Sequence, residues 1–272
     1  EGTILKHNTP SLFCIVYTNK NTIKLQQQYR KLNGFQGRPA SLIDANLGVV
    51  SPPDTVVNHT KKAGDKVLFN THYTYGPDGF RVTPDSDSSA KADKYALFYG
   101  CSFTFGWGLN DNETLAYYFS KDNSEYASYN YGENGYGPQQ MLALLENPNA
   151  HSAIKENDGF AIYSYIDDHV LRVIPGTASL TRLEGKTPYY HLKKDKFIRN
   201  GFYADRYNLK SIAFRIMNKS NIFKYFKIGY PFQLEREHYA YTAKMIKAAA
   251  DEYTRKFKND NFYVLIYPIP FF

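Results

Sequence analysis

Residues 95–108 read YALFYGCSFTFGWG, an apolar run that changes abruptly into a glycine-rich segment. An unbroken apolar run such as Tyr95 to Tyr99 is typical of a strand that is covered on both faces, as in a parallel sheet. The glycines that follow let the chain turn tightly around Ser102. Open parallel sheets hold their ligands at the carboxyl ends of the strands. The stretch therefore predicts a buried strand whose exit presents the Ser102 hydroxyl at a ligand-binding edge.

The sequence after this stretch alternates between strand and helix patterns. Apolar runs predict further strands at residues 126–131, 160–166 and 261–267. A capping-box pattern at residues 110–113 and a proline at 138 predict two helix starts. Apolar spacings of three and four predict a long helix with a buried face made of Tyr239, Ala243, Ile246, Ala250, Tyr253 and Phe257. Alternating strands and helices predict an α/β domain with a parallel sheet over residues 94–272.

Three other regions lie outside this alternation. Residues 1–50 are predicted to form an N-terminal extension, with a helix-compatible stretch at 22–32. Residues 51–93 are predicted to hold two extended strands between 55 and 75, a turn at 76–79 and a linker at 84–93. Residues 176–232 are predicted to be an irregular, aromatic-rich insertion that forms one wall of the cleft.

Composition narrows the class of protein. The chain has 272 residues, 25 Tyr and 19 Phe, and such aromatic content suits either a sugar-binding groove or a well-filled core. The net charge is +7, but the basic residues are scattered, and the densest run, residues 193–196, contains an aspartate. We therefore interpret that run as a solvated loop and predict no nucleic-acid partner.

The cysteines, the apolar runs and the first residue bear on metal binding and on the cellular compartment of the protein. Cys14 and Cys101 are too few for a disulfide framework or a zinc cluster, and we predict no metal and no cofactor. No run approaches the roughly 20 apolar residues that a membrane span needs. The sequence begins at Glu1 without Met, which suggests a processed start. Removal of a leader would favour a periplasmic or extracytoplasmic location, and otherwise the location is cytoplasmic.

Two further segments border the same predicted edge as Ser102. Residues 130–138, NYGENGYGP, follow the second strand, and Gly132, Asn134 and Gly135 are predicted to line the cleft. Small residues let backbone N–H groups approach a substrate oxygen, as an oxyanion hole requires, although a helix-capping loop is the alternative. The third strand ends in the acids and imidazole of residues 167–169.

These segments together resemble the conserved blocks of SGNH (GDSL-type) hydrolases. Residues 98–108 are similar to the nucleophile block of a bacterial branch that reads G-[DC]-S-F-T-F-G-x-G, and residues 130–137 resemble the second block. Residues 78–81, DGFR, resemble the x-G-[FL]-R segment that precedes the nucleophile strand in such proteins. The resemblance covers residues 76–172 well and the closing helix and strand loosely. It implies a three-layer α/β/α, flavodoxin-like fold around a central parallel sheet.

The resemblance also implies roles for individual residues. Ser102 would be the nucleophile, and the backbone N–H groups of Ser102 and Gly135 would be the oxyanion donors. The sequence departs from the family pattern at Cys101, where an Asp is usual, and at Asp167, where an Asn is usual. An ionised carboxylate at Asp167 accepts hydrogen bonds and would oppose an oxyanion.

The general base is the remaining question. The family takes it from a D-x-x-H block after the last strand, and this sequence ends at Phe272, so the base is expected from a downstream segment or from elsewhere. The local substitute is His169, oriented by Asp168. The alternatives are a structural histidine and a helix-capping aspartate.

The resulting expectation is a serine esterase whose substrate is a small-molecule, carbohydrate or lipid ester. Attack by Ser102 on an ester carbonyl would give an acyl-enzyme that water releases. Two alternatives stay open: a polysaccharide O-acetyltransferase, and a non-catalytic polysaccharide-binding module derived from a hydrolase. The sequence does not indicate an oligomeric state.

Overall fold

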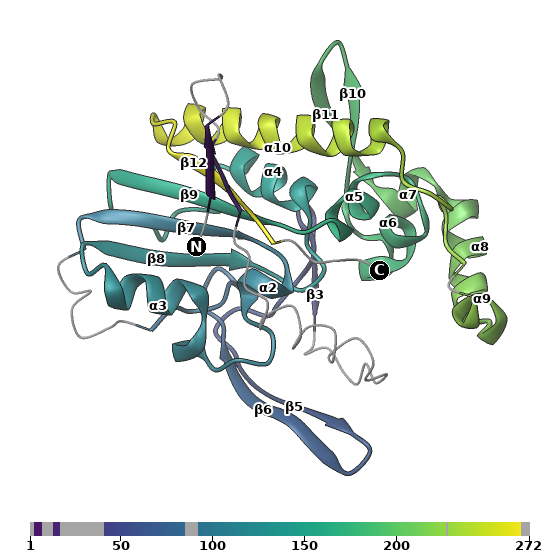
Figure 1. Cartoon of the computed structure of the whole chain (residues 1–272), viewed down its shortest axis with the longest axis horizontal. Coiled ribbons are helices and arrows are strands. Elements are labelled where there is room, and N and C mark those ends of the chain that lie inside the picture. The colour runs from purple at the N-terminus through teal and green to yellow at the C-terminus, as the bar shows by residue number, and fades with distance from the viewer. Residues whose placement is uncertain (1–2, 7–12, 17–40, 85–91, 227, 268–272) are drawn as a thin grey trace.

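The computed structural model of the chain describes residues 3–6, 13–16, 41–84, 92–226 and 228–267 (Figure 1). A parallel sheet forms its centre. Its strands are β7 (Lys94–Gly100), β8 (Tyr126–Gly132), β9 (Asp158–Tyr165) and β12 (Phe262–Ile266). They lie in the order β12-β9-β7-β8, and each neighbouring pair is parallel. The predicted parallel sheet is therefore confirmed.

Two N-terminal strands extend this sheet beyond β12. β2 (Phe13–Val16) pairs with β12 in parallel, and β1 (Thr3–Lys6) pairs with β2 in antiparallel. Part of the region predicted as an extension thus belongs to the main sheet. The stretch at 22–32 and most of the linker at 84–93 lie outside the described residues.

Helices cover both faces of the sheet. Tyr95, Leu97 and Tyr99 of β7 join a core cluster with α4 (Pro138–Glu146) and α10 (Arg236–Phe257). Ala96 and Phe98 point to the other face, where they pack with α3 (Leu115–Asp122). Successive side chains of a strand alternate between faces, so the apolar run at 95–99 is buried on both. This arrangement is compatible with the predicted three-layer α/β/α architecture.

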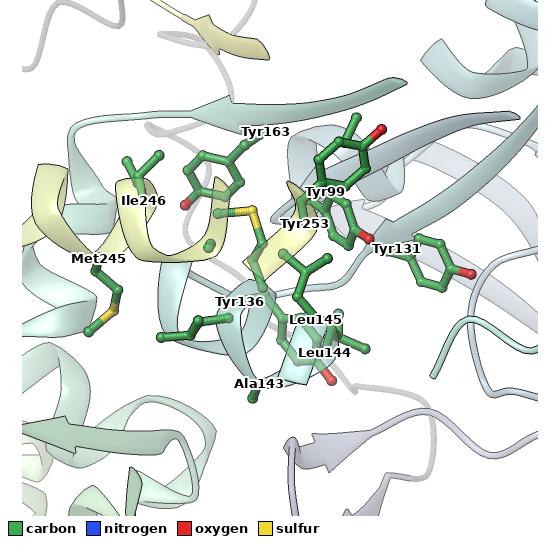
Figure 2. Packing of buried hydrophobic residues seen from close by; sticks show 14 of the residues in the cluster. Tyr99, Tyr131, Tyr136, Ala143, Leu144, Leu145, Tyr163, Met245, Ile246 and Tyr253 are labelled. Carbon is green, nitrogen blue, oxygen red and sulfur yellow. The ribbon is translucent and has the colours of Figure 1, made fainter. Parts of the chain in front are cut away.

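Tyrosines fill much of this core (Figure 2). Tyr99, Tyr131, Tyr163 and Tyr253 are fully buried. Most of their hydroxyls have polar partners, such as Tyr95 for Tyr253 at 3.0 Å. A buried tyrosine combines a large apolar ring with a polar tip that needs such a partner. For these residues, core packing explains the aromatic content better than a sugar-binding groove does.

A hairpin projects from the body of the molecule (Figure 1). Its strands are β5 (Val56–Ala63) and β6 (Lys66–Thr74), which confirms the two extended strands predicted between residues 55 and 75. A smaller antiparallel pair, β3 (Leu42–Asp44) and β4 (Gly48–Val50), precedes it. The turn predicted at 76–79 is also present, since Gly79 N–H donates to the Gly76 carbonyl at 3.0 Å.

The prediction of an irregular insertion over residues 176–232 is wrong, because short elements follow one another there. They are α6 (Thr177–Thr181), a 3-10 helix at Arg182–Gly185, β10 (Pro188–Lys193), β11 (Lys196–Phe202), α7 (Tyr203–Arg206), α8 (Asn208–Lys219) and α9 (Asn221–Tyr225). Lys194 and Asp195 have positive φ values of 48° and 60° and form the tight turn between β10 and β11. Two consecutive positive φ values suit a two-residue hairpin turn, and apolar periodicity alone does not reveal it.

The long C-terminal helix is present, and Ile246, Ala250 and Tyr253 of its predicted face are buried, but other positions of that face differ. Tyr239 is 43% exposed and Ala243 is also exposed, whereas Thr242 and Met245 are buried. Thr242 tolerates burial because its hydroxyl donates to the His238 carbonyl at 2.8 Å. A polar side chain that satisfies itself within its own helix is missed by a pattern of apolar residues.

Candidate functional site

The exits of β8, β7 and β9 lie side by side. Gly100 at the end of β7 pairs in register with Gly132 at the end of β8, and Tyr99 pairs with Tyr163 of β9. The three segments that the sequence predicted at one edge of the sheet therefore do meet there.

Ser102 begins a one-turn helix, α2 (Ser102–Phe105), immediately beyond β7. Its side chain is partly exposed, and no other described residue forms a hydrogen bond with its Oγ. As the first residue of the turn, its backbone N–H lies where a helix leaves donors unsatisfied. The hydroxyl and the amide are therefore both available to a ligand.

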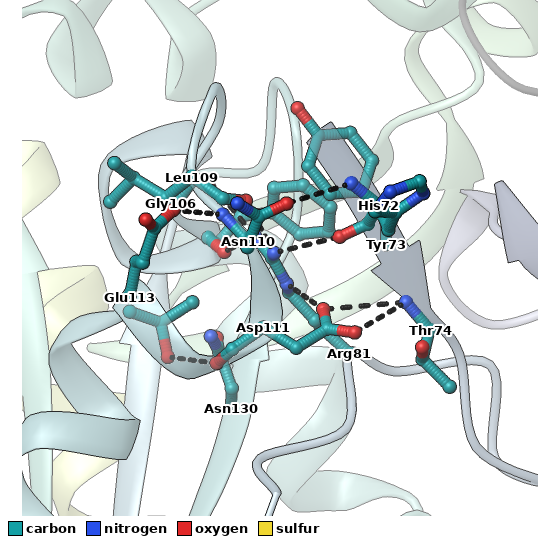
Figure 3. Close-up of polar contacts among 12 residues, drawn as sticks. His72, Tyr73, Thr74, Arg81, Gly106, Leu109, Asn110, Asp111, Glu113 and Asn130 are labelled. Atoms are coloured by element: carbon teal, nitrogen blue, oxygen red, sulfur yellow. Dashed lines mark hydrogen bonds and ion pairs between the residues drawn. The ribbon is translucent and has the colours of Figure 1, made fainter. Parts of the chain in front are cut away.

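Arg81 holds the loop that follows α2 (Figure 3). Its guanidinium donates to the carbonyls of Phe105 at 2.7 Å, Gly106 at 2.9 Å and Leu109 at 2.6 Å. It also pairs with Asp111 at 2.8 Å, and its side chain is fully buried. Five N–H groups in one planar fork let a single arginine satisfy several acceptors. Arg81 thus fixes the loop beside Ser102 through the carbonyls at the end of α2.

Gly132 has a steric role. A Cβ on this residue would lie 2.6 Å from Phe105 N and 2.7 Å from Thr104 Cβ, so only glycine lets β8 approach α2 this closely. Its N–H donates to Asn130 Oδ1 at 3.1 Å, while Asn130 Nδ2 donates to the Thr104 carbonyl at 3.0 Å. The interpretation of Gly132 as a cleft-lining donor is therefore corrected, because its amide is engaged inside the protein.

Gly135 is buried in the turn that follows β8. It has a left-handed φ of 86°, and across the described part of the chain its N–H has no hydrogen-bond partner. The neighbouring Asn134 N–H donates instead to Glu133 Oε1 at 2.6 Å. Glu133 is buried and also accepts the Ser51 hydroxyl at 2.8 Å, which ties the segment before the hairpin to this turn.

At the third strand end, Asp168 binds two arginines and does not orient His169. Its carboxylate accepts from Arg172 Nε at 2.9 Å and from Arg182 at 3.1 Å. Burial by itself would raise the pKa of Asp168, but the two guanidinium groups outweigh burial and lower the pKa to about 2. Arg172 also donates to the Tyr136 carbonyl and faces the buried Cys101 thiol, so it links the second and third segments.

His169 is fully buried in α5 (Asp168–Val173). Its Nδ1 lies 2.7 Å from the Tyr163 hydroxyl, and Nε2 is buried without a partner in the described residues. Burial, followed by the charge of Arg172, lowers the pKa of His169 well below its usual range. No hydrogen bond joins this ring to Ser102 within the described chain. The imidazole thus has a structural partner and is a weak base.

Asp167 is the remaining predicted residue of this edge. Its carboxylate is partly exposed and does not cap α5. Burial and then the charge of Asp167 raise the pKa of the Tyr165 hydroxyl, so the carboxylate lies next to that ring. Asp167 therefore places a negative group, which can accept but not donate, beside the exits of the strands.

Acid should weaken the Asp168 network within a defined pH window. The ordinary pKa of an aspartate is 3.8, and that of folded Asp168 is about 2. Because the folded value is the lower one, the stabilisation is complete above pH 3.8 and is lost as the pH falls towards 2. Asp168→Asn should melt below the wild type at neutral pH, and the gap should close through that window. Thermal melts by circular dichroism, with the exposed Asp122→Asn as control, measure it; a gap that stays constant contradicts the ion-pair account.

An open cavity lies between the aromatic insertion and the start of α10. It has a volume of about 920 Å³ and is lined by residues that include Tyr189, Tyr207, Tyr230 and Tyr241. Ser102 does not line this cavity. That the insertion forms one wall of the cleft at Ser102 stays a prediction.

Within the described ranges, no group of three or more His, Cys, Asp or Glu side chains is arranged to hold a metal ion. None of the helices in those ranges is long and apolar enough to cross a membrane.

No protein-family model matches the chain, and no curated protein matches it.

Proposed function

We propose that this protein is a serine esterase of the SGNH type, with the three-layer SGNH fold around its parallel sheet. One observation carries the proposal: a partly exposed Ser102 hydroxyl without a hydrogen-bond partner among the described residues stands at the exit of β7. In the turn after β8, the N–H of the buried Gly135 has no hydrogen-bond partner among the described residues. A nucleophile flanked by backbone donors at a strand exit is the arrangement that acyl transfer requires.

The chemistry follows from these groups. Ser102 Oγ would attack the ester carbonyl and lose its proton to a base, and the carbonyl oxygen would become an oxyanion held by the N–H groups of Ser102 and Gly135. Collapse of this intermediate passes the proton from the base to the departing alcohol and leaves an ester on Ser102. Water then attacks that ester and gives a proton to the base, which returns it to Ser102 Oγ as the carboxylic acid leaves.

The hydrogen bonds of the histidines among the described residues go to groups other than Ser102. We propose a histidine from a D-x-x-H block after β12, as in the family that the sequence resembles. A serine hydroxyl is a poor nucleophile at neutral pH without such a partner.

Hydrolysis of p-nitrophenyl acetate tests the proposal. The full-length protein should release p-nitrophenolate faster than its Ser102→Ala variant at equal concentration. Equal rates in the two proteins would contradict the assignment of the nucleophile.

A binding module derived from a hydrolase is the second candidate, and Asp167 is the observation that favours it. A carboxylate beside the strand exits opposes an oxyanion but suits hydrogen bonds from sugar hydroxyls. A full-length protein that binds polysaccharide but hydrolyses no ester would support this candidate over the esterase.

Asp167→Asn should raise the esterase rate by about tenfold. The substitution replaces an acceptor with an amide that can donate to the oxyanion, and one such donor is worth about 10²–10³ in kcat where it is well placed. Steady-state kinetics on p-nitrophenyl acetate measures the effect, and Asp158→Asn, at the opposite end of β9, is the control. A lower kcat in Asp167→Asn would show that the carboxylate takes part in the reaction.

A further inference from the structure

Helices α8 and α9 carry large apolar side chains at the surface. In α8, Leu209 is 83% exposed, Ile212 49% and Ile216 67%. In the segment of α9, Ile222 is 67% exposed and Tyr225 81%. Both helices lie at the edge of the molecule, away from the sheet (Figure 1). Large apolar residues gathered at a surface mark an interaction site more often than scattered ones do.

The exposed residues of α8 form one stripe. At 100° per residue, Leu209, Ile212 and Ile216 fall within a sector of about 60° on the helix. The opposite side of α8 packs on the domain, where the Ser211 hydroxyl is buried and donates to the Leu180 carbonyl at 3.0 Å. The stripe is therefore not the face that holds α8 in place. It points outwards.

Basic residues border this stripe on both sides. In α8, Lys210 falls on one flank of the helical projection, and Arg215 and Lys219 fall on the other. Arg206 ends the preceding helix, α7 (Tyr203–Arg206). All four are exposed. The sequence from residue 206 to residue 234 also contains Lys224 and Lys227 and has no Asp or Glu. Since the chain as a whole has 26 acidic residues, this segment is strongly one-sided in charge.

We propose that the surface of α8 and α9 binds an anionic lipid bilayer, with α8 lying in the plane of the interface. An apolar stripe flanked by Lys and Arg is how such helices insert their apolar side chains and attract lipid headgroups. Each basic residue near an anionic membrane adds to the attraction. A second copy of the chain fits less well, because a symmetric contact through this face would bring cations against cations.

Sedimentation with vesicles tests the proposal. The protein is mixed with unilamellar vesicles of phosphatidylcholine alone, or of phosphatidylcholine and phosphatidylglycerol at three to one, in low and high salt. One variant removes the stripe, Ile212→Ser with Ile216→Ser, and another reverses charge, Lys210→Glu with Lys219→Glu. The control is Val67→Ser with Lys66→Glu, an exposed apolar and basic pair on the β5–β6 hairpin.

We expect the wild-type protein to bind the anionic vesicles, and we expect high salt to weaken this binding. Each surface variant should lose affinity by at least about tenfold, and the control variant should lose none. Ser102→Ala should bind as the wild type does, because the lipid surface is independent of the reaction. Failure of the wild type to bind anionic vesicles, or binding by the two surface variants as tight as that of the wild type, would overturn the proposal. So would a change from dimer to monomer in the Ile212→Ser, Ile216→Ser variant without vesicle binding by the wild type, since the face would then join two copies.

Discussion

Arg81→Met is expected to lower the free energy of unfolding by about 3–5 kcal/mol. The side chain is fully buried and satisfies the carbonyls of Phe105, Gly106 and Leu109 as well as the Asp111 carboxylate. Methionine keeps much of the volume but leaves all four acceptors without this donor. An acidic side chain that loses its buried partner costs more than a surface ion pair does. Urea unfolding followed by circular dichroism measures the change.

A second, exposed arginine serves as the control that separates the effect of burial on stability from the effect of losing a charge. Arg255 pairs with Glu252 on the surface of α10 and is 66% exposed, so Arg255→Met should cost about 1 kcal/mol or less. Arg81→Met should also lower the esterase rate of the protein that remains folded, because α2 and the loop after it lose their anchor. Equal stability losses in the two variants would contradict the role assigned to Arg81.

Ser102→Ala is expected to lower kcat/KM for p-nitrophenyl acetate by at least about 10³-fold. The variant lacks the atom that forms the acyl-enzyme. Its unfolding free energy should stay within about 0.5 kcal/mol of the wild type, because Ser102 Oγ has no hydrogen-bond partner among the described residues. The exposed Ser124→Ala should change neither quantity.

The expected result combines a large loss of activity with an unchanged free energy of unfolding. A large loss of stability would mean that the hydroxyl holds the fold together, which the geometry does not show. Retained activity would mean that another group is the nucleophile.

The parallel sheet was predictable because its signals are local. A strand covered on both faces has to be apolar at every position, and Tyr95 to Tyr99 meets that requirement without knowledge of its partners. The meeting of the three strand exits follows in turn, since parallel strands end at one edge. The elements of the insertion were missed because α8 exposes apolar residues and buries Ser211, so the usual rule of apolar burial fails there.

The contacts within the site could not be predicted, because they depend on residues far apart in the sequence. Asp168 stands next to His169 in the chain but binds Arg172 and Arg182 in space. The spacing of four between Asp168 and Arg172 on a helix was the signal that could have revealed the first pair. Gly132 was predicted to line the cleft, and its close approach to Phe105 appears only in three dimensions.

Covalent labelling tests the central claim most directly. The full-length protein is treated with a fluorophosphonate, digested, and mapped by mass spectrometry. The account predicts a single adduct on Ser102, formed faster than on free serine and absent from Ser102→Ala. An adduct on another residue, or labelling that persists in Ser102→Ala, would contradict it.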